Sequence, residues 1–251
     1  MTRQKLGQHF LVRGSVLGRI ARAACPEPEP LVIEIGAGRG ALTAHLLDRA
    51  ERVVAIEIDP YLAAHLRQKF GAEERLEVIE SNALETDLGQ WGPAAITGNL
   101  PYYVATPLLE LVLQLGARWR RGVFLVQKEV AARVGAPPGS RAYGYLSVAS
   151  QLFADVEILF EVPAAAFHPP PKVDSAVLRL LPRERAGELG IPDPPDFLRF
   201  VALCFRQKRK TIRNNLSAAY GAVVDDWPEA ALRAEQINIA GFAVMYRRLV
   251  P

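Results

Sequence analysis

Cysteine is scarce in this chain of 251 residues, since only Cys25 and Cys204 are present and they stand far apart in the sequence. Two distant cysteines argue against a disulfide framework and against a cysteine-based metal site, and they suit a reducing compartment. Histidine is also scarce, and the four histidines show no ligand spacing. We therefore expect no metal.

Long apolar stretches are missing as well. No run of eighteen apolar residues occurs, which argues against a membrane span, and residues 1–7 lack the apolar core of a signal peptide. The composition, with 50% hydrophobic and 23% charged residues, is ordinary for a soluble globular protein. We expect a cytoplasmic protein with no membrane partner. The formal net charge of +3 is only mildly basic, so the position of the charges matters more than their sum.

The most informative stretch is GNLPY at 98–102, which follows an apolar run at 94–96 that reads as a buried strand. Asn99 offers both a hydrogen-bond donor and an acceptor, and Pro101 fixes the backbone around Leu100. The ring of Tyr102 can stack on a planar partner. This arrangement predicts binding of an exocyclic amine, whose hydrogens Asn99 and the Leu100 carbonyl would accept. The alternative is a plain Asn-x-Pro turn that closes a strand.

A glycine-rich turn joins a predicted strand at 31–35 to a predicted helix at 41–50. Gly36 and Gly38 let the backbone approach a ligand closely. Glu57 ends the next predicted strand, about twenty residues beyond the first glycine, where a carboxylate can accept from both ribose hydroxyls. The combination predicts a nucleoside-bearing ligand, although a simple tight turn and a solvated strand end are the alternatives.

The glycine turn alone does not distinguish S-adenosylmethionine from a dinucleotide, since both contain adenosine. Two features favour S-adenosylmethionine: no second phosphate-binding signature is visible, and the 98–102 stretch suits an amine acceptor rather than a hydride acceptor. A methyl transfer of this kind needs positioning and charge placement more than acid–base catalysis. A dehydrogenase remains a distant alternative.

Predicted strands and helices alternate along the first part of the chain, which predicts an α/β fold with a mostly parallel sheet and helices on both faces. Such sheets bind ligands at the carboxyl ends of their strands. Four residues follow predicted strands in this way: Gly36, Glu57, Asn82 and Asn99. Asn82 is expected to read a base edge, with a turn-forming role as the alternative.

Two further strands, at 156–160 and 176–181, have no helix between them, so we predict an antiparallel pair at one edge of the sheet. The proline-rich loop that joins them contains Phe167. We expect Phe167 and Tyr102 to sandwich the substrate base between their rings.

The last part of the chain is predicted to be a small helical bundle. Residues 183–195 are rich in Pro, Gly and charge and read as a linker, and helices are expected at 197–205, 216–220, 229–234 and 240–249. A dense cationic run contains Arg206, Lys208, Arg209, Lys210 and Arg213. No acid interrupts this run, which favours binding of a nucleic-acid backbone over a solvated helix face. A base attacked at its exocyclic amine must leave its stack, so the target lies in a loop or is flipped out.

Seven motifs in order along the chain resemble the KsgA (RsmA) family of ribosomal RNA small-subunit adenine dimethyltransferases. They are GQHFL at 7–11, EIGAGRGALT at 34–43, GNLPY at 98–102, QKEV at 127–130, YG at 143–144, PPPKVDSAV at 169–177 and RQKRKTIRN at 206–214. The match covers nearly the whole chain, and the last two motifs are more specific than the glycine turn.

The resemblance implies a Rossmann-like class I S-adenosylmethionine-dependent methyltransferase with a mostly parallel seven-stranded sheet and a small all-α C-terminal domain. We therefore expect a methyltransferase domain at 1–182 and an RNA- and ribosome-binding domain at 196–251. The implied reaction dimethylates N6 of two adjacent adenosines near the 3′ end of 16S rRNA, within a precursor of the small (30S) ribosomal subunit. We expect the enzyme to be a monomer.

By the same resemblance, the donor site contains His9, Leu11, Gly36, Glu57, Asn82 and Asn99. His9 stands where the family commonly has Asn, and Asn82 stands where it commonly has Asp. Two alternatives remain: an Erm-type 23S rRNA adenine methyltransferase that confers macrolide resistance, and a ribosome-assembly factor that binds RNA without turnover. The QKEV motif and the cationic run resemble the small-subunit enzyme, and the intact 98–102 stretch argues against a protein without turnover.

Overall fold

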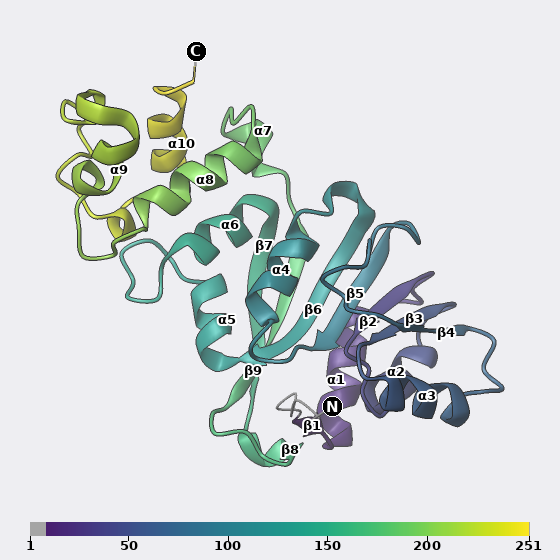
Figure 1. Cartoon of the computed structure of the whole chain (residues 1–251). Coiled ribbons are helices and arrows are strands. Elements are labelled where there is room, and N and C mark those ends of the chain that lie inside the picture. Colours follow the sequence, from purple (N-terminus) through teal and green to yellow (C-terminus); the bar gives the residue numbers. More distant parts are fainter. Residues whose placement is uncertain (1–8, 251) are drawn as a thin grey trace. The chain divides into compact units, whose positions relative to one another are not determined.

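The computed structural model describes residues 9–250 (Figure 1). Gly7 and Gln8 of the first motif lie outside the described residues. Within them the chain divides into two compact units. The first contains residues up to 131 together with 156–182, and the second contains 132–155 together with 183–250. Each unit is described by itself.

A seven-stranded sheet forms the centre of the first unit, in the order β4-β3-β2-β5-β6-β9-β7. The strands are β2 (Val32–Ile35), β3 (Val53–Glu57), β4 (Leu76–Glu80), β5 (Ala94–Asn99), β6 (Trp119–Gln127), β7 (Ala154–Val162) and β9 (Ser175–Pro182). Neighbouring strands from β4 to β6 are parallel, and β9 is antiparallel to β6. The predicted mostly parallel sheet is confirmed, and β9 and β7 occupy one edge as expected.

The central strands are buried on both faces. Every residue of β2 and β3 is buried, and so are the residues of β5 up to Gly98. Because successive side chains of a strand point to opposite faces, burial of every residue means that both faces are covered. The helices of this unit are α1 (Gly14–Ala24), α2 (Ala41–Leu47), α3 (Pro60–Lys69), α4 (Ala105–Leu113) and the first part of α5 (Lys128–Val134).

Local sequence explains where α3 begins. The side chain of Asp59 accepts a hydrogen bond from the backbone of Tyr61 at 2.9 Å and caps α3, and Pro60 supplies the fixed φ of its first turn. Leu17 and Ile20 of α1 and Leu46 of α2 are buried in one apolar cluster with the sheet. Burial of such apolar side chains holds the two helices in place.

A second, two-stranded sheet was not predicted. Strand β1 (Phe10–Leu11) pairs antiparallel with β8 (Phe167–His168), with Phe10 opposite His168 and Leu11 opposite Phe167. The segments are about 160 residues apart in sequence, and two residues are too few for a strand pattern to be visible. This pairing joins Phe10 and Leu11 of the first motif to the proline-rich loop that contains Phe167.

The second unit is helical, as predicted. Its helices are α6 (Tyr145–Phe153), α7 (Arg185–Glu188), α8 (Pro194–Cys204), α9 (Ile212–Tyr220) and α10 (Ile239–Arg247), with 3₁₀ turns η3 (Gly221–Val224) and η4 (Ala234–Gln236). Phe197, Phe200 and Phe242 are almost fully buried in its core. The helix expected at 229–234 is wrong, because the chain forms turns there before η4.

The packing groups residues differently from the predicted domains at 1–182 and 196–251. Val148 and Leu152 of α6 lie in the apolar core of the second unit, so 132–155 belongs with the C-terminal helices. The predicted linker at 183–195 contains α7, and Ala186 and Ile191 are buried in that same core. Among residues 9–250, no helix has the length and apolar character needed to cross a bilayer.

Candidate active site

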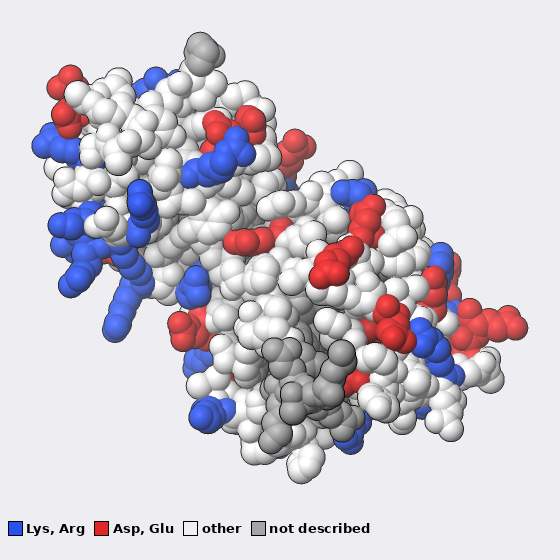
Figure 2. All heavy atoms as spheres, viewed as in Figure 1, with Lys and Arg blue, Asp and Glu red and all other residues white. Residues whose placement is uncertain are grey.

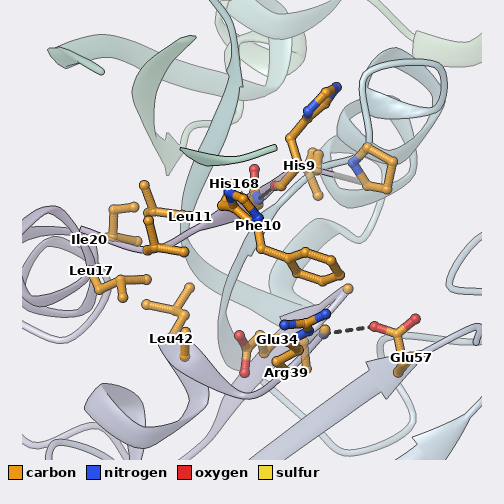
Figure 3. Close-up of a pocket in the computed structure, with 18 of the residues that line it drawn as sticks. His9, Phe10, Leu11, Leu17, Ile20, Glu34, Arg39, Leu42, Glu57 and His168 are labelled. Atoms are coloured by element: carbon orange, nitrogen blue, oxygen red, sulfur yellow. Dashed lines mark hydrogen bonds between the residues drawn. The ribbon is translucent and has the colours of Figure 1, made fainter. Parts of the chain in front are cut away.

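A cavity of about 370 Å³ opens at the carboxyl ends of β2, β3 and β5 (Figure 3). The strand order reverses between β2 and β5, which is where open parallel sheets bind ligands. Nine of the predicted site residues line this cavity: His9, Leu11, Gly36, Gly38, Glu57, Asn99, Leu100, Pro101 and Tyr102. The structure thus brings the glycine turn and the 98–102 stretch to one cavity. The volume of this cavity lies within the range of small-molecule sites.

The glycine turn needs glycine for two separate reasons. Gly36 and Gly38 have φ of +72° and +58°, in the left-handed region that side chains disfavour. A Cβ on Gly38 would also lie 3.1 Å from Cε1 of Phe10, and a Cβ on Gly98 would lie 2.3 Å from the carbonyl oxygen of Ile35. The glycines therefore let three segments meet closely around the cavity.

The carboxylate of Glu57 is fixed by the backbone of the turn that it faces. Its Oε2 accepts from the Gly38 N–H at 2.8 Å, and its Oε1 accepts from the Asp59 N–H at 3.0 Å. Glu57 is only 3% exposed. Burial raises the pKa of this carboxyl, and the backbone hydrogen bonds partly offset that rise. Glu57 therefore presents an acceptor in a set position at the end of β3.

A second buried carboxyl, which sequence reasoning did not single out, also lines the cavity. Glu34 of β2 is 2% exposed, and its Oε2 accepts from the Thr43 hydroxyl at 2.5 Å. Burial raises the pKa of Glu34 to about 7; the Thr43 hydrogen bond lowers it and the nearby Glu57 charge raises it. An acidic residue inside an otherwise apolar strand was the available signal.

Asn99 stands at the end of β5, and its side-chain amide is oriented by one hydrogen bond. Its Nδ2 donates to the carbonyl of His9 at 3.0 Å. Among the described residues nothing donates to its Oδ1 or to the carbonyl of Leu100. The Leu100 N–H donates to the Leu125 carbonyl at 3.0 Å and continues the β5–β6 ladder. Two backbone-anchored residues thus offer oxygen acceptors at the cavity wall.

Tyr102 is held both through its hydroxyl and through its ring. The hydroxyl lies 2.9 Å from Oγ of the fully buried Ser175, and burial raises the pKa of Tyr102. The ring stacks on His9, with centroids 5.8 Å apart and planes at 28°. Nδ1 of His9 is in turn 2.8 Å from the carbonyl oxygen of Pro169. An aromatic surface therefore borders the Asn99 acceptors.

Phe167 does not stand where it was expected. It is 4% exposed, lies in the apolar cluster beneath α1 and does not line the cavity. In the short β8 strand, neighbouring side chains point to opposite sides, so burial of Phe167 turns His168 toward the cavity instead. As placed here, Phe167 does not form the second side of a base sandwich with Tyr102. Tyr103, which is 63% exposed and also lines the cavity, was not singled out beforehand.

Asn82 is likewise outside the cavity lining. Its Oδ1 accepts from the Leu84 N–H at 3.1 Å, and its Nδ2 donates to Glu85 at 2.7 Å. Both ends of the amide serve the turn after β4. The structure therefore shows the turn-forming alternative for this residue.

The five predicted RNA-binding cations lie on the loop between α8 and α9 and on the first turn of α9, and all of them are exposed. Figure 2 shows Lys and Arg side chains gathered over this part of the second unit. One of the five is neutralised, because Nε of Arg213 lies 3.1 Å from the carboxylate of Asp225. Arg206, Lys208, Arg209 and Lys210 have no acidic partner among the described residues.

The backbone of this cationic loop (205–211) is held by the side chain of Asn215, which is 5% exposed. Its Oδ1 accepts from the Gln207 N–H at 3.0 Å, and its Nδ2 donates to the carbonyls of Cys204 at 2.8 Å and Gln207 at 3.2 Å. Lys208 Nζ donates to the carbonyl of Arg141 at 2.6 Å, which brings a further exposed cation beside the loop. Sequence reasoning missed Asn215 because a buried Asn in a polar helix has no periodic signature.

Within residues 9–250 no group of three His, Cys, Asp or Glu side chains is placed to hold a metal ion.

Comparison with known proteins decides the family. A family model described as "Ribosomal RNA adenine dimethylase" matches residues 1–245. The chain belongs to this family. Among curated relatives, ribosomal RNA small subunit methyltransferase A of Acidobacterium capsulatum is 43% identical over 98% of this chain and 90% of its own length. The protein of the same name from Gloeobacter violaceus is 42% identical over 99% of this chain and 93% of its own length.

Solved structures place this rRNA adenine dimethylase among methyltransferases of the same fold. A dimethyladenosine transferase from Plasmodium falciparum superposes with a TM-score of 0.81 at 25% identity, covering 96% of this chain and 98% of its own. The 23S rRNA methyltransferase ErmE gives 0.73 at 27% identity, covering 96% of this chain and 100% of its own. The fold is that of a class I S-adenosylmethionine-dependent methyltransferase, and the dehydrogenase alternative is wrong.

Proposed function

We propose that this adenine dimethylase uses S-adenosylmethionine to dimethylate N6 of two adjacent adenosines near the 3′ end of 16S rRNA, in a precursor of the small ribosomal subunit. One observation carries the proposal. The glycine turn, with Gly36 and Gly38, and the acceptor stretch Asn99–Tyr102 line the same cavity. A nucleoside ligand and an exocyclic amine can therefore meet there.

The residues around the glycine turn fit an adenosine-containing methyl donor. Glu57, held by the Gly38 N–H, has the position and the acceptor oxygens to bind ribose hydroxyls. The absence of side chains at Gly36 and Gly38 leaves room for a ligand against the backbone. S-adenosylmethionine, when bound, supplies an electrophilic methyl group on a sulfonium. His9 and Leu11, from the segment paired with β8, would close this part of the cavity.

The residues after β5 fit the methyl acceptor. In the proposed complex, Oδ1 of Asn99 and the carbonyl of Leu100 accept the hydrogens of the adenine amine and so orient its lone pair away from them. The hydrogen bond from Asn99 Nδ2 to the His9 carbonyl supports the orientation in which Oδ1 faces the amine. Tyr102 stacks on the base, which takes the place that the His9 ring holds beside it in the structure.

The cationic loop is proposed to bind the phosphate backbone of rRNA. Its four cations are exposed and have no acidic partner among residues 9–250, and Asn215 holds the backbone that carries them. An rRNA substrate implies a cytoplasmic enzyme. Since one chain carries both the cavity and the cationic loop, we propose a monomer.

An Erm-type reaction on 23S rRNA is the second candidate, because the chain resembles the ErmE structure over nearly its full length. The relatives named for the small subunit, at 36–43% identity, favour the first candidate over ErmE at 27%.

The two candidates are separated by supplying a radiolabelled methyl donor together with undermodified small subunits or free large-subunit rRNA. We expect the label on two adjacent adenines of 16S rRNA. A label confined to 23S rRNA would favour the Erm-type reaction. Binding of small subunits without any transfer would favour the assembly factor.

A matched pair of variants tests the aromatic part of the site. Tyr102→Ala should abolish transfer, because the stacking surface is lost, whereas Tyr102→Phe keeps the ring and loses only the hydroxyl contact with Ser175. Equal turnover by the alanine variant and the wild type would remove Tyr102 from the mechanism.

A further inference from the structure

The ionisable side chains that line the cavity include two carboxyls and one guanidinium. Two buried carboxyls, Glu34 and Glu57, lie at the ends of β2 and β3. Arg39 is the single Arg or Lys side chain among the described residues that line the cavity. The guanidinium attracts an anionic group of a ligand, whereas an ionised carboxylate repels it.

Arg39 is positioned by the turn on both sides of it. Gly38 and Gly40, with φ of +58° and +74°, flank it in the left-handed region. Lys69 Nζ, which comes from α3, donates to the carbonyls of Arg39 and Gly40 at 3.0 and 3.3 Å. The backbone from which the Arg39 side chain projects is therefore anchored, although the side chain itself is exposed.

The guanidinium of Arg39 is held against an aromatic ring and lacks an acidic partner among the described residues. Its Cζ lies 4.9 Å from the centroid of the Phe10 ring. Figure 3 shows the guanidinium beneath Phe10, on the side of the cavity where Glu34 lies. A contact of this kind with an aromatic ring still leaves guanidinium N–H groups available to donate to an anion.

The methyl donor of the proposed function carries four recognisable groups: a ribose diol, a sulfonium, an ammonium and a carboxylate. Glu57 accounts for the diol, and the carboxyls favour the two cationic groups. The carboxylate of the methionine part has no partner among them. A guanidinium matches a carboxylate with two parallel hydrogen bonds and keeps its charge at any relevant pH.

We propose that Arg39 binds the α-carboxylate of the methionine part of the methyl donor. This assignment rests on the proposed function and adds a residue that recognises the amino-acid end of the ligand. It also gives Phe10 a role, since its ring holds the guanidinium over the turn. A phosphate of the target RNA is the competing anion.

The test measures dissociation constants of two ligands by calorimetry, on the full chain without RNA. S-adenosylhomocysteine retains the carboxylate, and its decarboxylated analogue lacks only that group. For Arg39→Ala we expect binding of S-adenosylhomocysteine to weaken about 10- to 100-fold, as for loss of a charged hydrogen-bonded pair. Binding of the decarboxylated analogue should change less than about twofold, because the interaction is already absent.

Two further variants test whether the effect comes from the paired hydrogen bonds of Arg39 and from its place in the cavity. Arg39→Lys keeps the charge but not the paired hydrogen bonds, so its loss should be intermediate. Arg22→Ala removes an exposed arginine of α1 that does not line the cavity, and it should leave both constants unchanged.

The outcomes are distinct. Equal weakening of both ligands by Arg39→Ala, or weakening of neither, overturns the assignment to the carboxylate. Unchanged ligand binding with a raised KM for rRNA would instead assign Arg39 to an RNA phosphate. A wild-type chain that binds neither ligand would overturn the proposed methyl donor, and the Arg39 assignment would fall with it.

Discussion

The cavity and the cationic loop use charge in opposite ways. Around the cavity the ionisable groups Glu34 and Glu57 are almost fully buried, and each is fixed by hydrogen bonds from the turn or helix beside it. On the loop, the cations are exposed and the buried polar group is an uncharged amide, Asn215. In the cavity, hydrogen bonds fix the ionisable side chains themselves. On the loop, hydrogen bonds fix the backbone, and the charged side chains extend from it.

This difference matches the two kinds of ligand. A small ligand gains from groups fixed in a poorly solvated site, where each electrostatic interaction is stronger and orientation is set in advance. A long polyanion gains from several exposed cations that release counterions, and it tolerates side chains that adjust. Changes in the cavity should therefore affect turnover and stability, whereas changes on the loop should affect binding in a salt-dependent way.

After the loss of transfer expected from Tyr102→Ala, the largest effect is expected from Asn99→Ala. Loss of the acceptor that orients the adenine amine should lower the rate of methyl transfer by about a hundred- to a thousandfold, a size typical of one preorganised polar group. Donor binding should stay largely intact, because Glu57 and the glycine turn remain. Single-turnover transfer to undermodified small subunits and calorimetry with S-adenosylhomocysteine measure the two quantities. Unchanged turnover would remove the central role of the 98–102 stretch.

The next largest effect concerns the buried charge of Glu34. Its pKa rises from 4.5 in the unfolded chain to about 7 in the folded one, so the folded state holds the proton longer. Stability contributed by this protonated group is complete below about pH 4.5 and is lost as the pH rises through about 7. Glu34→Gln never ionises, so its stability relative to the wild type should increase across this window by about 3 kcal/mol.

Denaturant unfolding at a series of pH values measures this difference in free energy of unfolding. Glu51→Gln, which removes a carboxyl at an exposed position, is the matched control. If the difference in free energy of unfolding between Glu34→Gln and the wild type stays constant between pH 4 and pH 8, the buried-charge interpretation is contradicted.

Reversal of three charges on the loop comes next. Lys208→Glu, Arg209→Glu and Lys210→Glu combined should weaken binding of small subunits and reduce the slope of log affinity against log salt by about two to three, since each lost phosphate contact removes about 0.7 to 0.9. The dissociation constant of S-adenosylhomocysteine should not change. Filter binding at several salt concentrations tests this, and a binding constant indifferent to both salt and mutation would return the loop to an ordinary solvated surface.

The smallest effect compares two cations of the same run. Arg209 has no acidic partner among the described residues, whereas Arg213 is paired with Asp225. Arg209→Ala should therefore lower the salt slope by about one, and Arg213→Ala should lower it by less. The same binding assay distinguishes them. A larger effect from Arg213 would mean that its pair with Asp225 opens on RNA.

Much of the fold followed from local patterns. Alternating apolar strands and helices predicted the parallel sheet, because burial on both faces leaves a continuous apolar run in each strand. The cavity residues at the ends of β2, β3 and β5 followed from the same rule, since carboxyl ends of parallel strands share one edge.

One feature that the sequence did not predict is a contact between distant segments. The pairing of β1 with β8 joins strands of two residues each, and its register buries Phe167 and turns His168 to the cavity. No local pattern specifies such a register. Asn82 does not line the cavity, because Leu84 and Glu85 of its own turn satisfy both ends of its amide. The buried Asn215 was missed because a polar group in a core carries no periodic signal, whereas Glu34 could have been found as the one acidic residue of an apolar strand.

The grouping of residues 132–155 with the C-terminal helices has a practical consequence. The chain passes between the two units three times, so no single cut separates them. A fragment that stops at residue 182 would retain α6 but lose the helices that cover Val148 and Leu152. Such a truncated protein would expose an apolar face of α6 and tend to aggregate during expression. Separating methyl transfer from the proposed RNA binding of the cationic loop therefore requires point substitutions or a rejoined chain rather than a deletion.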